Sequence, residues 1–179
     1  MYNKLRFFCI GFIFFGIYSI AQAEENKQPM VNELQVLIDV SGSMKKNDPR
    51  NLRIPAIKLL INLLPEGTKV GFWLFAEKTT ELVKTGIVDK AWKKNALLKV
   101  KKIHSRGLFT NIEEAIEKAA EPWFKSSEQQ NRHLILLTDG MVDVSKDIMQ
   151  SAESRDRIMS QQLPLLQQAG VQVQTIALS

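Results

Sequence analysis

Cysteine is almost absent from this sequence. The 179 residues include a single cysteine, Cys9, which lies in an apolar segment near the N-terminus. The rest of the chain therefore offers no disulfide bond, no thiolate metal site and no cysteine nucleophile. A domain built from it must be held together by its apolar core, and this length suffices for one such core rather than two.

Long hydrophobic runs are also lacking. The most extended one covers 14 residues, Phe7 to Ile20, whereas a membrane-spanning helix needs about 20. Lys4 and Arg6 precede this run and Ala21-Gln22-Ala23 follows it, an order typical of a secretory signal peptide. We therefore predict a signal peptide over residues 1–23 and an exported protein, located in the periplasm, in the cell envelope or outside the cell. An uncleaved membrane anchor is the alternative.

A strong excess of one charge sign is the third missing feature. The net charge is +5, and removal of residues 1–23 takes away two basic residues and leaves +3. A near balance of basic and acidic residues does not favour nucleic-acid binding. Membrane contact is expected only through the signal peptide or through a C-terminal part that this sequence lacks, and the oligomeric state stays open.

What the sequence does contain is an alternation of strands and helices after a polar lead-in at residues 24–33. Strands are predicted over residues 34–40, 69–75, 81–84, 133–138 and 171–178, and helices over residues 51–64, 89–103, 110–122 and 154–169. Pro122 is expected to end the third helix, and the fourth is expected to be kinked or restarted near Pro164. The alternation predicts one α/β domain over residues 34–179, with a doubly wound, Rossmann-like, mostly parallel sheet flanked by helices.

The first predicted strand ends in a group of oxygen donors. Asp39 lies at its carboxyl end, and Ser41 and Ser43 follow on either side of Gly42, which lets the chain turn sharply. Open α/β sheets place their ligand sites at this edge. Carboxylate and hydroxyl oxygens that converge on one point suit Mg²⁺.

Two further donors are expected at the same edge. Thr110 precedes the third predicted helix, and Asp139 follows the apolar strand 133–138. Two carboxylates would balance the charge of Mg²⁺, and the neutral hydroxyls would leave it able to accept water or an outside carboxylate. Each residue also has a simpler explanation, since Thr110 or Asn111 is a candidate N-cap and Asp139 a candidate turn residue.

These motifs resemble the metal-ion-dependent adhesion site of von Willebrand factor type A (VWA) domains. The matching residues are Asp39-Val40-Ser41-Gly42-Ser43, Thr110 and Thr138-Asp139-Gly140, in the same order and spacing over about residues 34–178. The resemblance implies that Asp39, Ser41, Ser43 and Thr110 surround the metal and that Asp139 often acts through a water. It further implies Mg²⁺, with Mn²⁺ and Ca²⁺ as alternatives, and a protein ligand that offers a carboxylate, without catalysis.

The resemblance also bears on the end of the chain. Domains of this family usually continue with a further helix and strand after the strand predicted here at residues 171–178. On that ground we expect residues 34–179 to lack the last helix and strand of the domain, and the chain to be part of a longer exported protein.

Two other functions stay open. A Mg²⁺-dependent phosphohydrolase would also place an aspartate at a strand end. Such enzymes generally need a second carboxylate two residues later, where this chain has Ser41, and no phosphate loop of the Gly-x-x-x-x-Gly-Lys type is present. The other alternative is a structural domain with a vestigial metal site.

Several charged residues lie close to the predicted site. Lys45, Lys46 and Arg50 follow the serine turn and either line its rim, where they would attract an acidic ligand, or form a solvated loop. The two histidines, His104 and His133, are expected to be surface or core residues rather than metal ligands.

Overall fold

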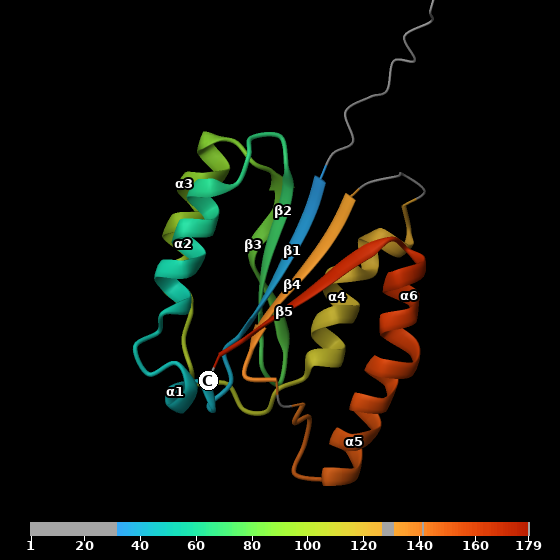
Figure 1. Cartoon of the computed structure of the whole chain (residues 1–179). Helices are drawn as coiled ribbons and strands as arrows, with labels where there is room; N and C mark the ends of the chain where they lie inside the picture. Colours follow the sequence, from blue (N-terminus) through green and yellow to red (C-terminus); the bar gives the residue numbers. More distant parts are fainter. Residues whose placement is uncertain (1–31, 127–130, 141, 179) are drawn as a thin grey trace, which may run out of the picture.

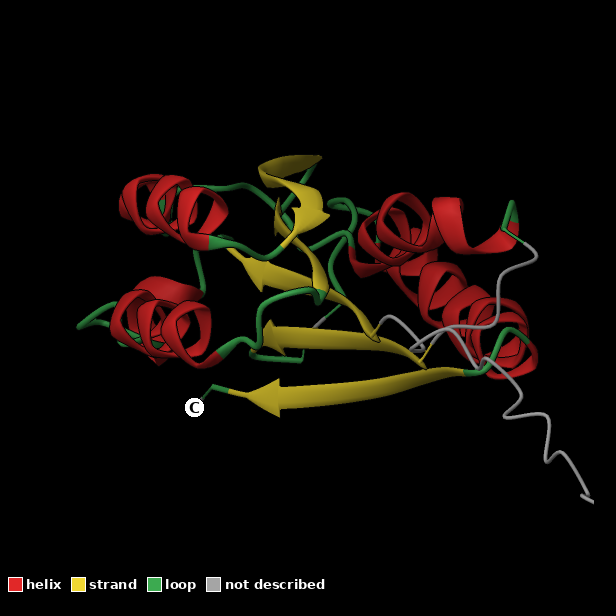
Figure 2. Cartoon of the chain, turned by 90° about the horizontal axis from the view of Figure 1, so that it is seen from above, coloured by secondary structure: helices red, strands yellow, loops and turns green. Residues whose placement is uncertain are grey.

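The computed structural model describes residues 32–126, 131–140 and 142–178, and shows an open sheet with helices on both faces (Figures 1 and 2). Five strands are arranged in the order β3-β2-β1-β4-β5. β1 (Asn32–Asp39) is parallel to β2 (Lys69–Phe75) and to β4 (Asn131–Thr138), and β5 (Val171–Ala177) is parallel to β4. Only β3 (Thr79–Ile87) is antiparallel. The predicted doubly wound, mostly parallel fold is confirmed.

The helices form one layer on each face of the sheet. The first layer consists of α2 (Arg53–Leu63) and α3 (Lys90–Lys99), which a 3₁₀ turn, Val100–Lys102, extends. α4 (Ile112–Phe124) covers the other face with α5 (Ile148–Arg157), a π-helical turn (Ile158–Gln162) and α6 (Leu163–Gln168) (Figure 1). The short α1 (Met44–Asn47) lies at the sheet edge where β1 ends.

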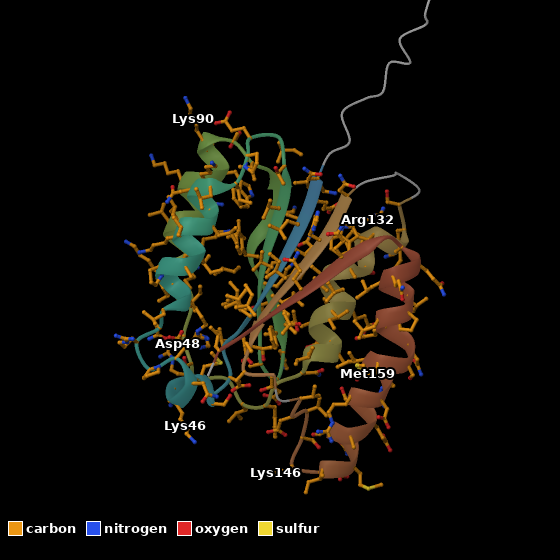
Figure 3. All side chains as sticks on the ribbon, in the orientation of Figure 1. Lys46, Asp48, Lys90, Arg132, Lys146 and Met159 are labelled. Atoms are coloured by element: carbon orange, nitrogen blue, oxygen red, sulfur yellow. The ribbon has the colours of Figure 1, made fainter. Side chains whose placement is uncertain are left out.

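β1 lies at the centre of the sheet and is buried on both faces. Val36 and Ile38 pack in the core under α2 and α3, whereas Leu37 packs in the core under α4 and α6. Side chains fill the space between each helix layer and the sheet (Figure 3). Because the chain builds β2 and β3 on one side of β1 and then returns to build β4 on the other, the carboxyl ends of β1 and β4 form the topological switch point.

Two predicted boundaries in the middle of the chain were wrong. The short strand expected at residues 81–84 runs from Thr79 to Ile87, because β2 supplies an antiparallel partner along this length. Pro122 does not end the third helix, which continues to Phe124. The indole of Trp123 is only 2% exposed, and its burial holds this last turn against the loss of one backbone hydrogen bond at the proline.

The last helical segment begins earlier than predicted. α5 starts at Ile148, where the Asp147 side chain accepts a hydrogen bond from the Met149 N–H. Ile148 and Met149 are exposed, so this first part shows no apolar stripe in the sequence. The irregularity predicted near Pro164 is confirmed, since the π-helical turn lies just before it.

The N-terminal predictions fall largely outside the described residues. The signal peptide at residues 1–23 lies wholly outside them, and so does the lead-in except for its last two residues, which already belong to β1. Among the helices that the structure describes, none is long and apolar enough to cross a membrane.

Candidate metal centre

Asp39 ends β1 with its carboxylate fully buried at the switch point. Its Oδ1 accepts a hydrogen bond from the backbone N–H of Ser41 at 2.8 Å. Its Oδ2 accepts a hydrogen bond from the hydroxyl of Thr138, the last residue of β4, at 2.7 Å. Both carboxylate oxygens are therefore oriented by neighbours on two adjacent strand ends.

The surroundings of Asp39 disfavour its negative charge. Burial raises the pKa of this carboxyl above its ordinary value of 3.8, hydrogen bonds from Ser41 and Thr138 oppose the rise, and the negative charge of Asp139 adds to it. A buried carboxylate close to a second carboxylate is stabilised when a cation compensates the two charges.

The two serine hydroxyls meet beside Asp39. Ser41 is buried and Ser43 is exposed, and their Oγ atoms lie 2.9 Å apart. The turn that brings them together is continued by α1, and the Ser43 side chain makes no capping hydrogen bond to that helix. The two hydroxyls therefore lie side by side next to Asp39, where they were predicted to act as ligands.

Asp139 follows β4 directly and is held by α1. The side-chain amide of Asn47 donates a hydrogen bond to Oδ2 of Asp139 at 2.9 Å. Asn47 lies on the helix that begins just after Ser43, so α1 links the serine turn to the second carboxylate. Asn47 was not predicted to contribute to the site, because no local pattern connects residues 47 and 139.

Thr110 reaches the same edge of the sheet through backbone pairing. It forms an isolated antiparallel bridge with Asp143, in which its N–H donates to the Asp143 carbonyl at 2.5 Å. Three residues earlier, Gly107 bridges Ser41 and donates its N–H to the Val40 carbonyl at 2.9 Å. The loop that carries Thr110 is therefore fixed against both the serine turn and the segment that follows Asp139.

Gly107 is essential to this approach because a side chain does not fit there. A Cβ atom at this position would lie 2.2 Å from the Cβ of Ala76 and 3.0 Å from the Val40 carbonyl oxygen. The sequence places a glycine in this loop but gives no sign of what it contacts. Gly107 thus belongs to the residues that position the site and that sequence reasoning missed.

The structure excludes the N-cap explanation of Thr110. The N-cap of α4 is Asn111, whose Oδ1 accepts a hydrogen bond from the Glu114 N–H at 3.1 Å. The Thr110 side chain does not serve as the cap, although it is only 4% exposed.

The donor set fits a hard divalent cation. Its oxygens come from two carboxylates, Asp39 and Asp139, and from the hydroxyls of Ser41, Ser43 and Thr110, which are the ligand types that Mg²⁺, Mn²⁺ and Ca²⁺ accept. The described residues include no group of three or more His, Cys, Asp and Glu side chains that could hold a metal ion. A metal at this edge would therefore depend on the hydroxyls.

A buried arginine, Arg53, anchors the backbone at the end of β1. Arg53 is 1% exposed, donates through Nε to Oδ2 of Asp48 at 2.7 Å and through Nη2 to Oγ of Ser105 at 2.6 Å, and also donates to the backbone carbonyl of Asp39. It joins the end of β1 to the start of α2 and to the loop after α3. No pattern in the sequence indicates this role, since an arginine in the first turn of a helix is ordinarily solvated.

Asp48 is the acidic partner in this arrangement. Burial alone would raise its pKa, but hydrogen bonds from the Arg53 side chain and from the N–H groups of Leu52 and Arg53 outweigh it and hold the pKa below the ordinary value of 3.8. Asp48 is therefore a charged structural group, and its charge is neutralised by Arg53.

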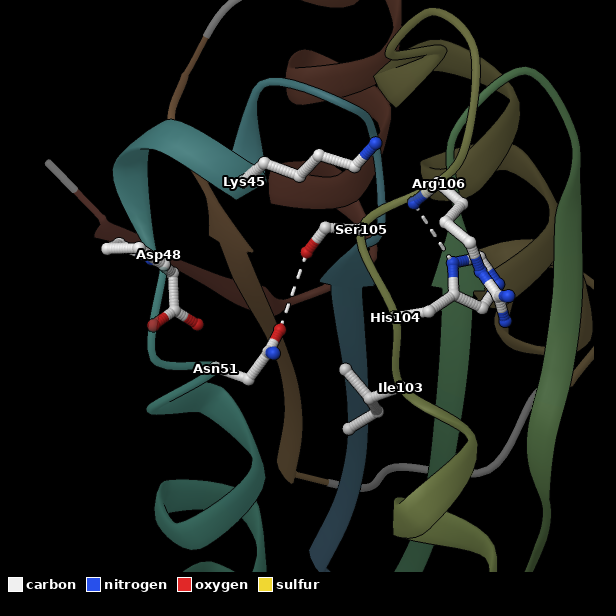
Figure 4. A pocket seen from close by; sticks show the side chains of 8 residues that line it. Lys45, Asp48, Asn51, Ile103, His104, Ser105 and Arg106 are labelled. Atoms are coloured by element: carbon white, nitrogen blue, oxygen red, sulfur yellow. Dashed lines mark hydrogen bonds between the residues drawn. The ribbon is translucent and has the colours of Figure 1, made fainter.

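The two histidines lie in different parts of the domain. His133 is a half-buried residue near the start of β4, at the opposite end of the strand from Asp139. His104 lines a pocket beside the site, together with Lys45 and Arg106 (Figure 4). Lys46 and Arg50 are exposed.

Comparison with known proteins identifies the family. The model of the von Willebrand factor type A domain matches residues 33–179. The chain belongs to the VWA family. No curated protein matches it in sequence. VWA domains generally mediate protein–protein interactions, some of them metal-dependent, and are typically adhesion modules without enzymatic activity.

Solved structures share the fold at low sequence identity. A von Willebrand factor type A protein from Catenulispora acidiphila is 19% identical with a TM-score of 0.61, over 82% of this chain and 33% of that one. The manganese-loaded TRAP protein of Plasmodium vivax is 24% identical with a TM-score of 0.62, over 84% and 58%. An aerotolerance-related membrane protein from Bacteroides fragilis is 23% identical with a TM-score of 0.53, over 82% and 67%. The chain thus spans a third of the first of these proteins and little more than half of the second.

Proposed function

We propose that this VWA domain is an exported protein-binding module that captures an acidic side chain of its partner through a divalent metal ion. The metal ligands would be Asp39, Ser41, Ser43, Thr110 and Asp139. The observation that carries the proposal is the clustering of buried Asp39, the paired serine hydroxyls and the Thr138–Asp139 turn at the switch point of the sheet. Mg²⁺ is the ion proposed, and Mn²⁺ and Ca²⁺ take the same ligand types.

The charges of the ligands explain why the partner would be acidic. Asp39 and Asp139 together balance the two charges of the cation, and the hydroxyls of Ser41, Ser43 and Thr110 add none. When bound, the metal supplies a positive centre that accepts a further hard oxygen ligand. Ser43 is exposed, so the site faces solvent on the side where a partner would approach.

Ser41 argues for binding rather than hydrolysis. It stands where a phosphohydrolase would carry the carboxylate that assists its nucleophilic aspartate. Its N–H instead holds Oδ1 of Asp39 at 2.8 Å, and its hydroxyl faces Ser43. The arrangement therefore supports a role for Asp39 as a fixed ligand rather than as a nucleophile.

Export is the second part of the proposal. It rests on the basic, apolar and small-residue order of residues 1–23. The structurally similar protein from Bacteroides fragilis is a membrane protein, which supports a location in the cell envelope. We propose that the partner is another exported or envelope protein.

The metal site is tested by calorimetric titration of the full chain with Mn²⁺ and with Mg²⁺. Asp39→Ala should abolish the binding heat, and Ser43→Ala, which alters an exposed side chain, should weaken it by more than about tenfold without loss of the fold. Asp156→Ala on α5, an exposed acid, is the matched control and should bind as the parent does. Unchanged titration heats in both site variants would refute the proposal.

Partner binding is tested with N-acetyl-aspartate amide as the carboxylate probe. The chain should bind it in the presence of Mg²⁺ and lose it on addition of a chelator. The same compound with asparagine in place of aspartate should not bind under either condition.

A further inference from the structure

A pocket of about 380 Å³ opens beside the proposed metal centre, a size within the usual range of ligand pockets. Lys45 from α1 lies on one side of it, and His104, Ser105 and Arg106 from the loop after α3 lie on the other (Figure 4). Asp48 and Asn51 also line the pocket.

The pocket has a positive charge that no described residue neutralises. Lys45 and Arg106 are exposed, and within the described residues neither forms an ion pair. The acid in the lining, Asp48, is already paired with buried Arg53 at 2.7 Å. The lining therefore includes two cationic residues and no uncompensated carboxylate.

His104 adds a hydrogen-bond donor to these charges. Its Nδ1 accepts the backbone N–H of Arg106 at 3.3 Å, which in the neutral ring leaves the proton on Nε2 (Figure 4). Burial, with the charges of Arg106 and Arg53, lowers the pKa of His104 and keeps the ring neutral. The lining can thus offer an ammonium, a guanidinium and an N–H, which together suit a carboxylate.

Both sides of the pocket are continuous with segments that carry proposed metal ligands. Lys45 follows Ser43 by two residues. Arg106 directly precedes Gly107, which bridges Ser41 and donates to the Val40 carbonyl. The pocket and the metal centre therefore share one surface, and a single short peptide segment of a partner can reach both.

We propose that this pocket, formed by Lys45, His104 and Arg106, binds a second acidic side chain of the partner whose first carboxylate occupies the metal centre. The recognition element is accordingly a pair of acids on one segment. This inference rests on the proposed function and makes it more specific, because a single acid would occupy only half of the site.

The test compares peptides with one and with two acids on the full chain in Mg²⁺. The probes are acetylated peptide amides of the form Asp-Glyₙ-Asp over a short series of spacer lengths, each with a control in which the second aspartate is asparagine. At the best spacer the second acid should tighten binding by about fivefold, the gain expected from weak ion pairs at a partly exposed pocket.

Substitutions in the pocket test whether it is the source of the tighter binding of the two-acid peptide. Lys45→Gln and Arg106→Gln should each reduce the difference between the two peptides, and together they should abolish it while single-acid binding and Mn²⁺ titration stay unchanged. Lys46→Gln and Arg50→Gln are the matched controls, since both residues are exposed outside the lining and Lys46 points away from the body of the protein (Figure 3).

The outcomes separate this inference from the proposed function. Metal-dependent binding of the single-acid peptide with no gain at any spacer would overturn the second-acid pocket and leave the proposed function standing. A gain that persists in the double variant would overturn the assignment to this pocket. Failure of both peptides to bind in Mg²⁺ would overturn the proposed function and this inference with it.

Discussion

The hydroxyl of Thr138 donates a hydrogen bond of 2.7 Å to Oδ2 of Asp39 and joins the carboxyl ends of β4 and β1. The hydroxyl oxygen of Thr138 also accepts a hydrogen bond from the Gly140 N–H at 3.1 Å. One buried hydroxyl therefore orients both the first carboxylate and the turn that carries Asp139. Thr138 is not a proposed ligand, yet the relative position of the two acids depends on it.

Thr138→Val is therefore expected to destabilise the metal-free protein. Valine has a similar shape but leaves the buried Oδ2 of Asp39 without its partner, which costs about 1–3 kcal/mol, and it also removes the acceptor of the exposed Gly140 N–H. Urea unfolding in the presence of a chelator measures this loss. Thr80→Val, at an exposed position of β3, is the control, and an equal effect of the two substitutions would contradict the role assigned to Thr138.

The raised pKa of Asp39 predicts how stability depends on pH and on metal. Because the folded-state pKa lies above the ordinary value of 3.8, the carboxyl favours the folded state when protonated, and this contribution is lost as the pH rises through the folded-state pKa. Asp39→Asn removes the charge. Without metal, the variant should be more stable than the parent at neutral pH, and its advantage should shrink as the pH falls toward 3.8.

Mg²⁺ should reverse this order at neutral pH. A ligand at about 100 times its dissociation constant stabilises the folded state by about 2.7 kcal/mol, and only the parent retains the charged ligand needed to bind it. Thermal unfolding of both proteins over a pH series, with Mg²⁺ and with chelator, measures the two effects. The difference in stability between the two proteins reports on Asp39. Asp48 and Glu113 have lowered pKa values in both proteins, and their contribution to stability is lost in both as the pH falls. A parent that gains nothing from Mg²⁺ would contradict the prediction.

The arginine below the site should be among the most sensitive positions. Arg53→Met leaves Asp48 charged and buried without its partner and removes a donor from the Asp39 carbonyl. Breaking a buried ion pair in this way costs about 3–5 kcal/mol, and addition of Asp48→Asn should restore part of the loss. Chemical unfolding of the single and double variants measures the coupling.

Arg50→Met provides the control for this experiment. Arg50 is exposed, so its replacement should change stability by less than about 0.5 kcal/mol. Equal losses in the Arg50 and Arg53 variants would show that the Arg53–Asp48 pair does not hold the end of β1 in place.

The fold and the candidate ligands could be predicted from the sequence because both correspond to local sequence patterns. β2 was predicted at residues 69–75, as observed, since a strand buried by helices on both faces is a continuous apolar run. Asp39, Ser41 and Ser43 were selected because their side chains suit a cation and they lie within one turn. Thr138 was named in the motif, but its hydrogen bond to Asp39 was not predicted, and neither was the one from Asn47 to Asp139, because these contacts join residues 99 and 92 positions apart, which no local pattern encodes.

Gly107 gives the sharpest test of how the loop that carries Thr110 is placed. Gly107→Ala would put a Cβ atom 2.2 Å from the Cβ of Ala76 and 3.0 Å from the Val40 carbonyl oxygen. Neither neighbour is the end of a flexible side chain, so the loop must shift away from the serine turn. We expect a loss of about 1–3 kcal/mol in stability from overpacking, together with weaker Mn²⁺ binding as Thr110 is displaced.

Two further variants separate displacement of the loop from a general effect of removing a glycine. Addition of Ala76→Gly to Gly107→Ala removes the closer of the two contacts and should recover part of the Mn²⁺ affinity. Gly42→Ala changes a glycine within the serine turn itself, but its Cβ would lie 3.5 Å from the Gly107 carbonyl oxygen, an ordinary contact, and its Mn²⁺ affinity should stay within about twofold of the parent. Calorimetric titration of the three variants with Mn²⁺ measures their relative affinities. If Gly107→Ala bound Mn²⁺ as well as Gly42→Ala does, the tight approach at Gly107 would have no part in placing Thr110 at the centre.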